Sequence, residues 1–295
     1  EATALATRLD ALAPVPERPA FERTSLADDE ALLERFFSDT ASLAFLVRRS
    51  GEVTCAADVD ALVSPKALKG VKHVAIVDGG AGLATTTLRR LLADATVAFV
   101  PSAAWLQVSP VDTSGDALVV GDPRGDLPSA RAEAREVMKT LGGELLEGDG
   151  ATLDAITSRW MHRPVLHFAG HGRLSVGAPW DARLDLARGQ TLDFELLLSR
   201  RPAPRLVVLS GCETGRSLDA PVDGLGLAEG FLAGGAVNVL ATTVEVDDAK
   251  ARRFIGRFYA HGGATKPTQA WRDAALEADA EGDDSWREWR LLGAR

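Results

Sequence analysis

Cysteine is scarce in this chain, which holds only two, Cys55 and Cys212, among 295 residues. Two thiols are too few for a disulfide framework or for a zinc site built from four cysteines. Such a composition is typical of a protein from a reducing compartment, so we expect a cytoplasmic location. The role of each cysteine must therefore be judged from the residues around it.

The chain also has no long hydrophobic run and no cluster of basic residues. No apolar stretch reaches the roughly 18 residues that a membrane-spanning helix needs, and no signal peptide opens the sequence. With 33 basic and 42 acidic residues the net charge is −9, whereas nucleic-acid binding needs Lys and Arg gathered on one face. We therefore expect no membrane and no nucleic acid among the partners of this domain.

The first region, residues 1–40, is predicted to be a helical lead-in. Leu5, Leu9 and Leu12 recur at helical spacing, and three prolines between residues 14 and 19 indicate a linker. A second helix is expected over 25–37, because an N-cap residue and an acidic first turn precede its apolar positions. The chain begins with Glu rather than Met, so it could be a piece of a longer protein.

Residues 41–115 and 116–295 alternate short apolar segments with helical ones. A hairpin around Ser50-Gly51 opens the first of these regions, and a polar, turn-rich stretch ends it. In the second region the strands are apolar throughout, which is typical of parallel strands buried on both faces. We therefore expect an α/β fold whose mostly parallel sheet carries helices on both faces, preceded by a smaller α/β region.

Two strands of the second region end in a residue that can do chemistry. The segment Val-Leu-His-Phe-Ala-Gly leads to His171, and Leu-Val-Val-Leu-Ser-Gly leads to Cys212. Ligands of open parallel sheets bind at the carboxyl ends of the strands. If the two strands are neighbours, the imidazole and the thiol come within hydrogen-bonding reach.

Such a pair is a candidate catalytic dyad. Cys212 would be the nucleophile, and His171 would take the thiol proton and later give it to the leaving amine. The backbone N–H groups of Gly172 and Cys212 could together hold the oxyanion. A gap of roughly 3 to 4 Å between the sulfur and the nearer imidazole nitrogen would support a formed dyad.

These two segments resemble the CHAT family, caspase-like peptidases related to separase and the caspases. The family pattern combines a strand ending in His-Phe-Ala-x-His-Gly with one ending in Val-Val-Leu-Ser-x-Cys-Glu-Thr-Gly, and the similarity runs from about residue 42 to the end. The resemblance implies a caspase-like catalytic domain over 116–295, preceded by a smaller, pseudo-caspase-like region over 41–115. Because helical repeats often precede domains of this family, it also implies that residues 1–40 could end an upstream repeat region. It also implies a cysteine endopeptidase that cuts a protein substrate and needs no metal or organic cofactor.

The resemblance further implies control of the site from outside these residues, by a regulatory domain or an activator. A role in bacterial antiviral defence or cell death is implied in the same way. Acidic residues near the cysteine bear on substrate choice, because related peptidases with an acid in the primary pocket prefer a basic residue before the cut. Asp223 and Glu213 are the candidates for that pocket, and Asp223 is explained equally well as a helix N-cap.

Other interpretations of the same residues stay open. A caspase-fold scaffold without catalysis would keep both strands, and an acyltransferase or amidase would use the same dyad on another substrate. His167 lies four residues before His171, but on a strand this spacing does not make a metal pair, and no third ligand is evident. We therefore expect no metal, a packed role for His167 and a structural role for Cys55.

Overall fold

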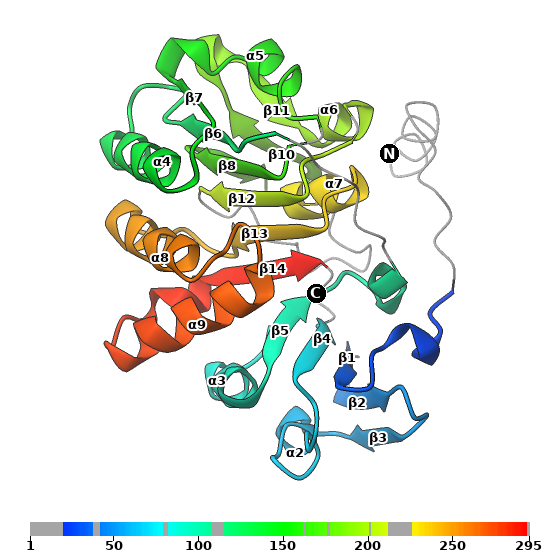
Figure 1. The fold of residues 1–295 in the computed structure, drawn as a ribbon. Helices are drawn as coiled ribbons and strands as arrows, with labels where there is room; N and C mark the ends of the chain where they lie inside the picture. The colour runs from blue at the N-terminus through cyan, green and yellow to red at the C-terminus, as the bar shows by residue number, and fades with distance from the viewer. Residues whose placement is uncertain are drawn as a thin grey trace.

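The computed structural model describes residues 20–37, 42–78, 82–107, 115–161, 163–175, 178–200, 202–211 and 226–293. Within these ranges, eleven strands form one sheet in the order β3-β2-β1-β4-β5-β14-β13-β12-β8-β6-β7, and three more form a small sheet in the order β11-β10-β9. Helices lie on both faces of the large sheet (Figure 1). The expected α/β class is therefore confirmed.

The elements follow the expected alternation over most of the chain. The strands are β1 (Glu30–Phe37), β2 (Ser42–Arg48), β3 (Val53–Ala56), β4 (His73–Val77), β5 (Thr96–Phe99), β6 (Leu118–Gly121), β7 (Glu144–Glu147), β8 (Val165–Ala169), β9 (Gly172–Ser175), β10 (Ala178–Asp185), β11 (Thr191–Asp193), β12 (Leu206–Ser210), β13 (Asn238–Thr242) and β14 (Trp289–Gly293). The α-helices are α2 (Val59–Leu62), α3 (Thr85–Asp94), α4 (Pro128–Leu141), α5 (Leu153–Thr157), α6 (Phe194–Ser199), α7 (Leu227–Ala233), α8 (Asp248–Ala260) and α9 (Pro267–Ala280). Short 3₁₀ turns are η1 (Arg23–Ser25), η2 (Ala103–Gln107), η3 (Gly148–Gly150), η4 (Ala187–Gly189) and η5 (Asp284–Glu288).

The large sheet consists of two parallel blocks that run in opposite directions. One block holds β7, β6, β8, β12 and β13, and its neighbouring strands are all parallel. The other holds β14, β5, β4 and β1, again parallel to one another. β14 pairs antiparallel with β13 and so joins the blocks, while β2 and β3 continue the far end as antiparallel strands.

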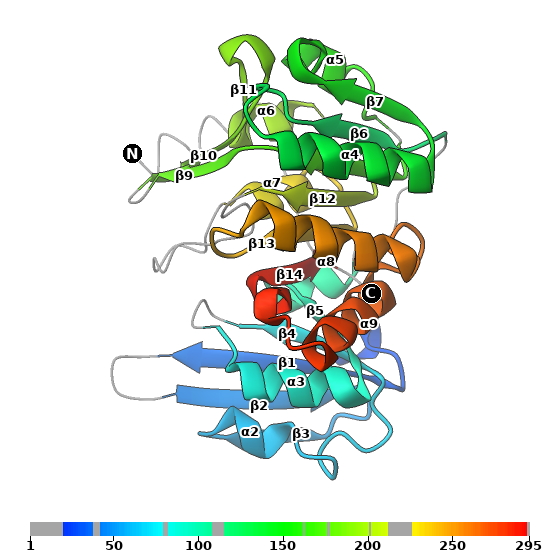
Figure 2. The same ribbon diagram turned by 90° about the vertical axis from the view of Figure 1, so that its left-hand side faces the viewer.

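Two layers of helices cover the sheet and explain why its central strands are apolar. α4, α8, α9 and α3 lie in a row along one face, while α6, α7 and the small sheet lie on the other (Figures 1 and 2). Every residue of β8, β12 and β13 is buried. Parallel strands between two such layers have no solvent-facing side, so apolar residues need not alternate with polar ones.

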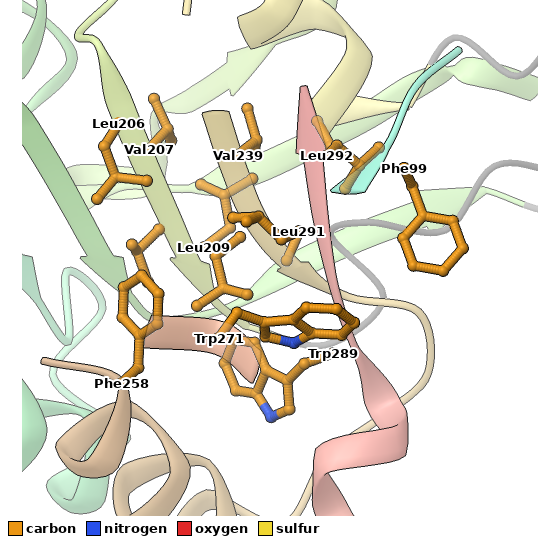
Figure 3. Close-up of a cluster of buried hydrophobic side chains, with 14 of the residues drawn as sticks. Phe99, Leu206, Val207, Leu209, Val239, Phe258, Trp271, Trp289, Leu291 and Leu292 are labelled. Atoms are coloured by element: carbon orange, nitrogen blue, oxygen red, sulfur yellow. The ribbon is translucent and has the colours of Figure 1, made fainter. Parts of the chain in front are cut away.

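Aromatic side chains fill the space between the sheet and the helices α8 and α9. Figure 3 shows Phe258, Trp271 and Trp289 against the leucines of β12 and β14. The Trp289 ring stacks on Phe254 with centroids 5.2 Å apart, and Trp271 meets the ring of Phe99 edge to face at 6.4 Å. Such pairs add about 0.5–1.5 kcal/mol each beyond the burial of their surface.

The helix expected over 25–37 is wrong. Residues 30–37 form β1, which pairs with β2 on one side and with β4 on the other. The four residues from Glu30 to Leu33 are all buried, so this part of the strand lacks the alternation that marks a half-exposed strand. The spacing of apolar residues alone does not distinguish such a buried strand from a helix. Here the strand forms because it pairs with β4, which follows about 40 residues later.

Other expectations about the first part of the chain have different outcomes. The hairpin around Ser50-Gly51 is confirmed, because β2 pairs antiparallel with β3. The helix and linker expected over 1–19 lie outside the described residues. β5, which precedes residue 115, and β14, which follows residue 116, are neighbours in the same large sheet. The division of the chain into two regions at residues 115 and 116 stays a prediction. In the described ranges, no helix combines the length and the hydropathy that crossing a membrane requires.

Candidate active site

His171 follows β8 at the edge where the parallel strands β6, β8 and β12 end. Ala169 is the register partner of Ser210, and the Gly170 N–H donates to the Ser210 carbonyl at 3.1 Å. The His171 carbonyl accepts a hydrogen bond from the Asp185 N–H at 3.0 Å. The backbone on both sides of His171 is therefore fixed by hydrogen bonds, and its side chain stays about one-third exposed, at 32%.

β8 and β12 are neighbours, as the sequence argument required. β12 ends at Ser210, and the carbonyl of the next residue, Gly211, accepts a hydrogen bond from the Thr242 hydroxyl. Cys212, Glu213 and Asp223 lie outside the described residues, so the distance from the thiol to the imidazole stays a prediction. Gly172 is the first residue of β9, and its part in an oxyanion hole is likewise still a prediction.

A carboxylate that the sequence analysis did not single out lies against the imidazole. Asp126 Oδ1 is 3.0 Å from His171 Nε2, and the Asp126 side chain is 43% exposed. Asp126 stands in the loop between β6 and α4, and β6 is the strand next to β8. The sequence offered one signal, an acidic residue just after a strand end, but the order of the strands was not known from it.

A strained residue begins the loop that carries Asp126. Asp122 has a left-handed backbone with φ 45° and a side chain that is 1% exposed. Its carboxylate accepts the Leu127 N–H at 2.9 Å and pairs with Arg131 at 2.8 Å, while its own N–H donates to Ala169 at 2.8 Å. These contacts connect the loop to β8 and to the first turns of α4, and so restrict the positions that the Asp126 side chain can occupy.

The charges around Asp126 keep it ionised. Burial by itself would raise the pKa of this carboxyl, but the hydrogen bond and the charge of His171, followed by the charge of Arg124, together lower it below the ordinary value. Arg124 Nη2 lies 2.9 Å from Asp126 Oδ2. An ionised carboxylate is a hydrogen-bond acceptor only, so His171 donates Nε2–H to Asp126 and leaves Nδ1 to accept a proton.

Asp248, the first residue of α8, is a second acid within electrostatic reach of His171. Burial raises the pKa of the Asp248 carboxyl, the charge of Asp247 raises it further, and the charge of His171 lowers it. The structure gives no hydrogen bond between Asp248 and the imidazole. Asp126 is therefore the carboxylate that orients the ring.

His167 belongs to the buried side of the sheet rather than to the site. Its Nε2 lies 3.1 Å from Glu133 Oε1, and the Tyr259 hydroxyl lies 3.3 Å from its Nδ1. Burial, followed by the charge of Glu133, holds the pKa of the Tyr259 hydroxyl well above its ordinary value. Over the described ranges, no group of three His, Cys, Asp or Glu side chains is arranged to hold a metal ion. The other cysteine, Cys55, is exposed on β3.

Comparison with family models finds one that covers most of the chain. A family model described as the CHAT domain matches residues 61–289. No curated protein shows a significant match to the chain.

Solved structures of peptidases share the fold. The Saccharomyces cerevisiae separase–securin complex superimposes with a TM-score of 0.56 at 14% identity, over 83% of this chain and 16% of that chain. The Arg-specific cysteine proteinase gingipain R gives a TM-score of 0.52 at 10% identity, over 80% of this chain and 66% of that chain. A complex of the pro- and mature domains of RgpB from Porphyromonas gingivalis gives 0.53 at 11% identity, over 80% and 68%. At these identities the similarity shows the fold alone, and this chain spans about one-sixth of the separase chain.

Proposed function

The chain belongs to the CHAT domain family, and from this premise we propose that it is a caspase-like cysteine endopeptidase. Cys212 is the nucleophile, His171 the general base and acid, and Asp126 the carboxylate that orients the imidazole. The proposal adds a third residue to the pair taken from the sequence. It includes a protein substrate and no metal or organic cofactor.

One observation carries the proposal. His171 has a carboxylate partner and lies just beyond β8, beside the end of β12, from which the chain continues through Gly211 to Cys212. His171 and Cys212 each follow a paired register position, Ala169 and Ser210, by two residues. In the sequence Cys212 comes directly after Gly211, the last described residue at this edge of the sheet, and this spacing supports pairing the thiol with His171.

The proposed reaction uses the imidazole twice. His171 Nδ1 takes the proton from Cys212 Sγ, and the thiolate attacks the scissile carbonyl carbon. The amides of Gly172 and Cys212 stabilise the oxyanion. When the C–N bond breaks, His171 gives its proton to the leaving amine, and a water molecule then hydrolyses the thioester by the reverse route. Asp126 keeps the Nε2–H tautomer in place throughout.

A thiol-reactive peptide probe, such as a peptidyl acyloxymethyl ketone, tests the proposal. We expect labelling at Cys212 that Cys212→Ala abolishes and that His171→Ala slows by about 10²- to 10⁴-fold. Asp126→Asn should slow it by more than about tenfold, because the tautomer is no longer fixed. Cys55→Ala is the matched control and should label like the wild type.

Two results would count against the proposal. Equal labelling of Cys55 and Cys212 would show ordinary thiol reactivity, and labelling of Cys212 that does not depend on His171 would rule out the dyad. Peptide and protein substrates then separate an endopeptidase from an amidase or acyltransferase, because only an endopeptidase releases two peptide fragments. A peptide library with Asp223→Asn and Glu213→Gln tests those two residues as pocket acids.

Regulation by a partner domain or ligand, a cytoplasmic location and a role in bacterial antiviral defence or cell death are further parts of the proposal. The separase structure contains a second protein, securin, which supports a protein partner for a domain of this fold. If the protein has a role of this kind, Cys212 will affect the growth of cells that carry the longer natural protein and its partners. Equal growth of wild-type and Cys212→Ala cells under those conditions would contradict it.

A further inference from the structure

A chain of ion pairs ends at the candidate base. His171 Nε2 lies 3.0 Å from Asp126 Oδ1, and Asp126 Oδ2 lies 2.9 Å from Arg124 Nη2. The other terminal nitrogen of the same guanidinium, Nη1, lies 3.0 Å from Asp185 Oδ2. Arg173 Nε and Nη2 also reach Asp185 Oδ2, each at 2.7 Å. The connected groups come from the loop after β6, from β9 and from the last residue of β10.

Asp185 is the most buried residue in this series of ion pairs. Its side chain is 10% exposed, whereas those of Arg124, Asp126 and Arg173 are 38%, 43% and 51% exposed. A carboxylate in such a place is unfavourable unless charged partners compensate for its lost hydration, and two guanidinium groups do so here. The Asp185 N–H also donates to the His171 carbonyl at 3.0 Å, so one residue contacts the backbone of the base and the arginine that holds its carboxylate.

The shape of the arginine side chain makes this connection specific. A guanidinium is planar, and its nitrogens point in fixed directions. Because Nη1 is bound to Asp185, the direction of Nη2 and therefore the place of Asp126 are set. The pKa of Arg124 lies above its ordinary value, first because of the hydrogen bond to Asp185 and then because of the charge of Asp126. An exposed aspartate without such a partner would sample several rotamers.

We propose that Asp185 is a positioning residue of the active site, which holds Asp126 against His171 through the guanidinium of Arg124. The inference rests on the proposed function, in which His171 is the base. In this role Asp185 acts on the imidazole through its neighbours Arg124 and Asp126. Its effect is to keep the imidazole in the Nε2–H tautomer with Nδ1 free.

One of these ion pairs, between Arg124 and Asp185, forms a wall of a cavity. The cavity has a volume of about 310 Å³ and is lined by Arg124 and Asp185 together with residues of η4 and the turn that follows it, among them Arg188 and Gln190. Removing the charge of Asp185 therefore changes both the orientation of the base and the polarity of this wall.

A double-mutant cycle tests the connection. The variants Asp185→Asn, Arg124→Gln and the double variant are compared with the wild type in the rate at which the peptide probe labels Cys212. If Asp185 acts through Arg124, each single change slows labelling by about tenfold or more, and the double variant is no slower than the slower single variant. Effects that multiply in the double variant, or single variants with the wild-type rate, would overturn the proposal.

The control is Asp279→Asn, at a partly buried carboxylate that receives two hydrogen bonds from Arg89, at 2.6 and 2.7 Å, far from the site. This variant should lose stability and keep the wild-type labelling rate. Arg124 is substantially exposed, so Arg124→Gln will fold and will keep the test decisive if Asp185→Asn does not.

A spectroscopic measurement separates this proposal from the proposed function. In Cys212→Ala protein with ¹⁵N-labelled histidine, the Nε2–H proton of His171 bound to Asp126 should give a downfield signal that His171→Gln removes. The signal should disappear or move in Asp185→Asn and in Arg124→Gln, and stay in Asp279→Asn. A signal unchanged by Asp185→Asn defeats the positioning role even if the chain is a peptidase. Absence of Cys212 labelling in the wild type defeats the peptidase and leaves this readout intact.

Discussion

Two residues with unusual backbones belong to the loops next to the candidate site. Asp122 and Arg188 are the non-glycine residues with positive φ in the described ranges, at 45° and 59°. Such conformations cost about 1–3 kcal/mol each and persist where the surroundings hold them. Asp122 begins the loop that presents Asp126, and Arg188 lines the cavity beside Arg124. Strain at both places fits loops that are shaped for a site rather than for stability alone.

Glu229, in the first turn of α7, is a single residue whose protonation bears on stability. Its Oε2 atom is buried, and the described part of the chain offers it no hydrogen-bond partner. Burial raises the pKa of this carboxyl from 4.5 to about 7, although backbone N–H groups of Glu229 and Gly226 act in the opposite direction. The folded chain therefore binds this proton more tightly than the unfolded chain. The contribution to stability is fully present below about pH 4.5 and is lost as the pH rises through about 7.

Glu229→Gln should remove this dependence. A shift from 4.5 to about 7 corresponds to at most about 3 kcal/mol, at 1.36 kcal/mol per unit. Between pH 4.5 and pH 8, the free energy of unfolding of the wild type should fall relative to that of the variant by up to this amount, as urea titrations measure it. A difference between the two proteins that stays constant over this range would contradict the prediction. Glu245→Gln, at an exposed position, is the control.

The site residues differ in how far the sequence could predict them. His171 could be predicted as a candidate because it stands at a strand end inside a distinctive motif, and both features are local. Asp126 was missed because its role depends on β6 lying next to β8, a pairing between segments more than 40 residues apart. The same holds for Asp185, which reaches the site only because the chain turns back through β9 and β10.

Among the elements, β6 and α4 approach so closely that the loop between them has little freedom. A Cβ atom on Gly121 would lie 2.4 Å from Ala134 Cβ, which real Cβ atoms do not tolerate. Glycine at the last position of β6 therefore lets α4 pack against the strand. The position of the helix in turn fixes Arg131, the partner of Asp122 at the start of the loop.

Gly121→Ala should push the strand and the helix apart. We expect a loss of about 1–3 kcal/mol in the free energy of unfolding, as for other overpacked sites, and slower probe labelling because the loop with Asp126 moves. Gly256→Ala in the middle of α8 is the matched control, since nothing lies within 4 Å of its Cβ position. That variant should gain about 0.5–1 kcal/mol from helix propensity alone. Equal stability of the two variants in chemical denaturation would refute this account of the β6–α4 contact.

The elements that the sequence predicted well are those whose environment is uniform along their length. β8 and β12 are buried on both faces, and their largely apolar runs between glycines and prolines made them recognisable as strands. β1 has the same buried character only in its first half, and its last residues, Phe36 and Phe37, are exposed. This mixture matched the spacing of an amphipathic helix. Only the neighbouring strands β2 and β4 supply the hydrogen bonds that favour the extended form.

The whole molecule is held together where its N-terminal half, residues 20–107, meets its C-terminal half, residues 115–293, at the neighbouring strands β5 and β14. β5 and β14 share a single register pair, Phe99 with Leu292, so the backbone contributes little to this junction. Side chains contribute more: Trp271 of α9 packs on Phe99, and Arg89 of α3 makes two hydrogen bonds with Asp279. Arg272 also donates to the carbonyls of Leu92 and Ala93 at the end of α3, at 2.6 and 2.9 Å.

Because these side-chain contacts join the two halves, we expect the halves to unfold together. A half separated from its partner would expose Phe99, Trp271 and the last turn of α3 to water, and burial of large apolar side chains is worth about 1.5–3 kcal/mol each. Leu91→Ala, at a fully buried position of α3, should cost about 2–5 kcal/mol in stability. If the halves are coupled, that loss reaches the C-terminal half as well, although the substitution lies outside it.

Tryptophan fluorescence can report on that half, because Trp160, Trp271, Trp286 and Trp289 are all fully buried there. In Leu91→Ala, the midpoint of unfolding by fluorescence should fall together with the midpoint by far-UV circular dichroism. A fluorescence midpoint that stays at the wild-type value, with a separate earlier transition by circular dichroism, would mean that the halves are independent. The close contact of α3 with α9 favours the first outcome, since α9 cannot keep Trp271 buried against Phe99 once β5 and α3 have lost their own packing.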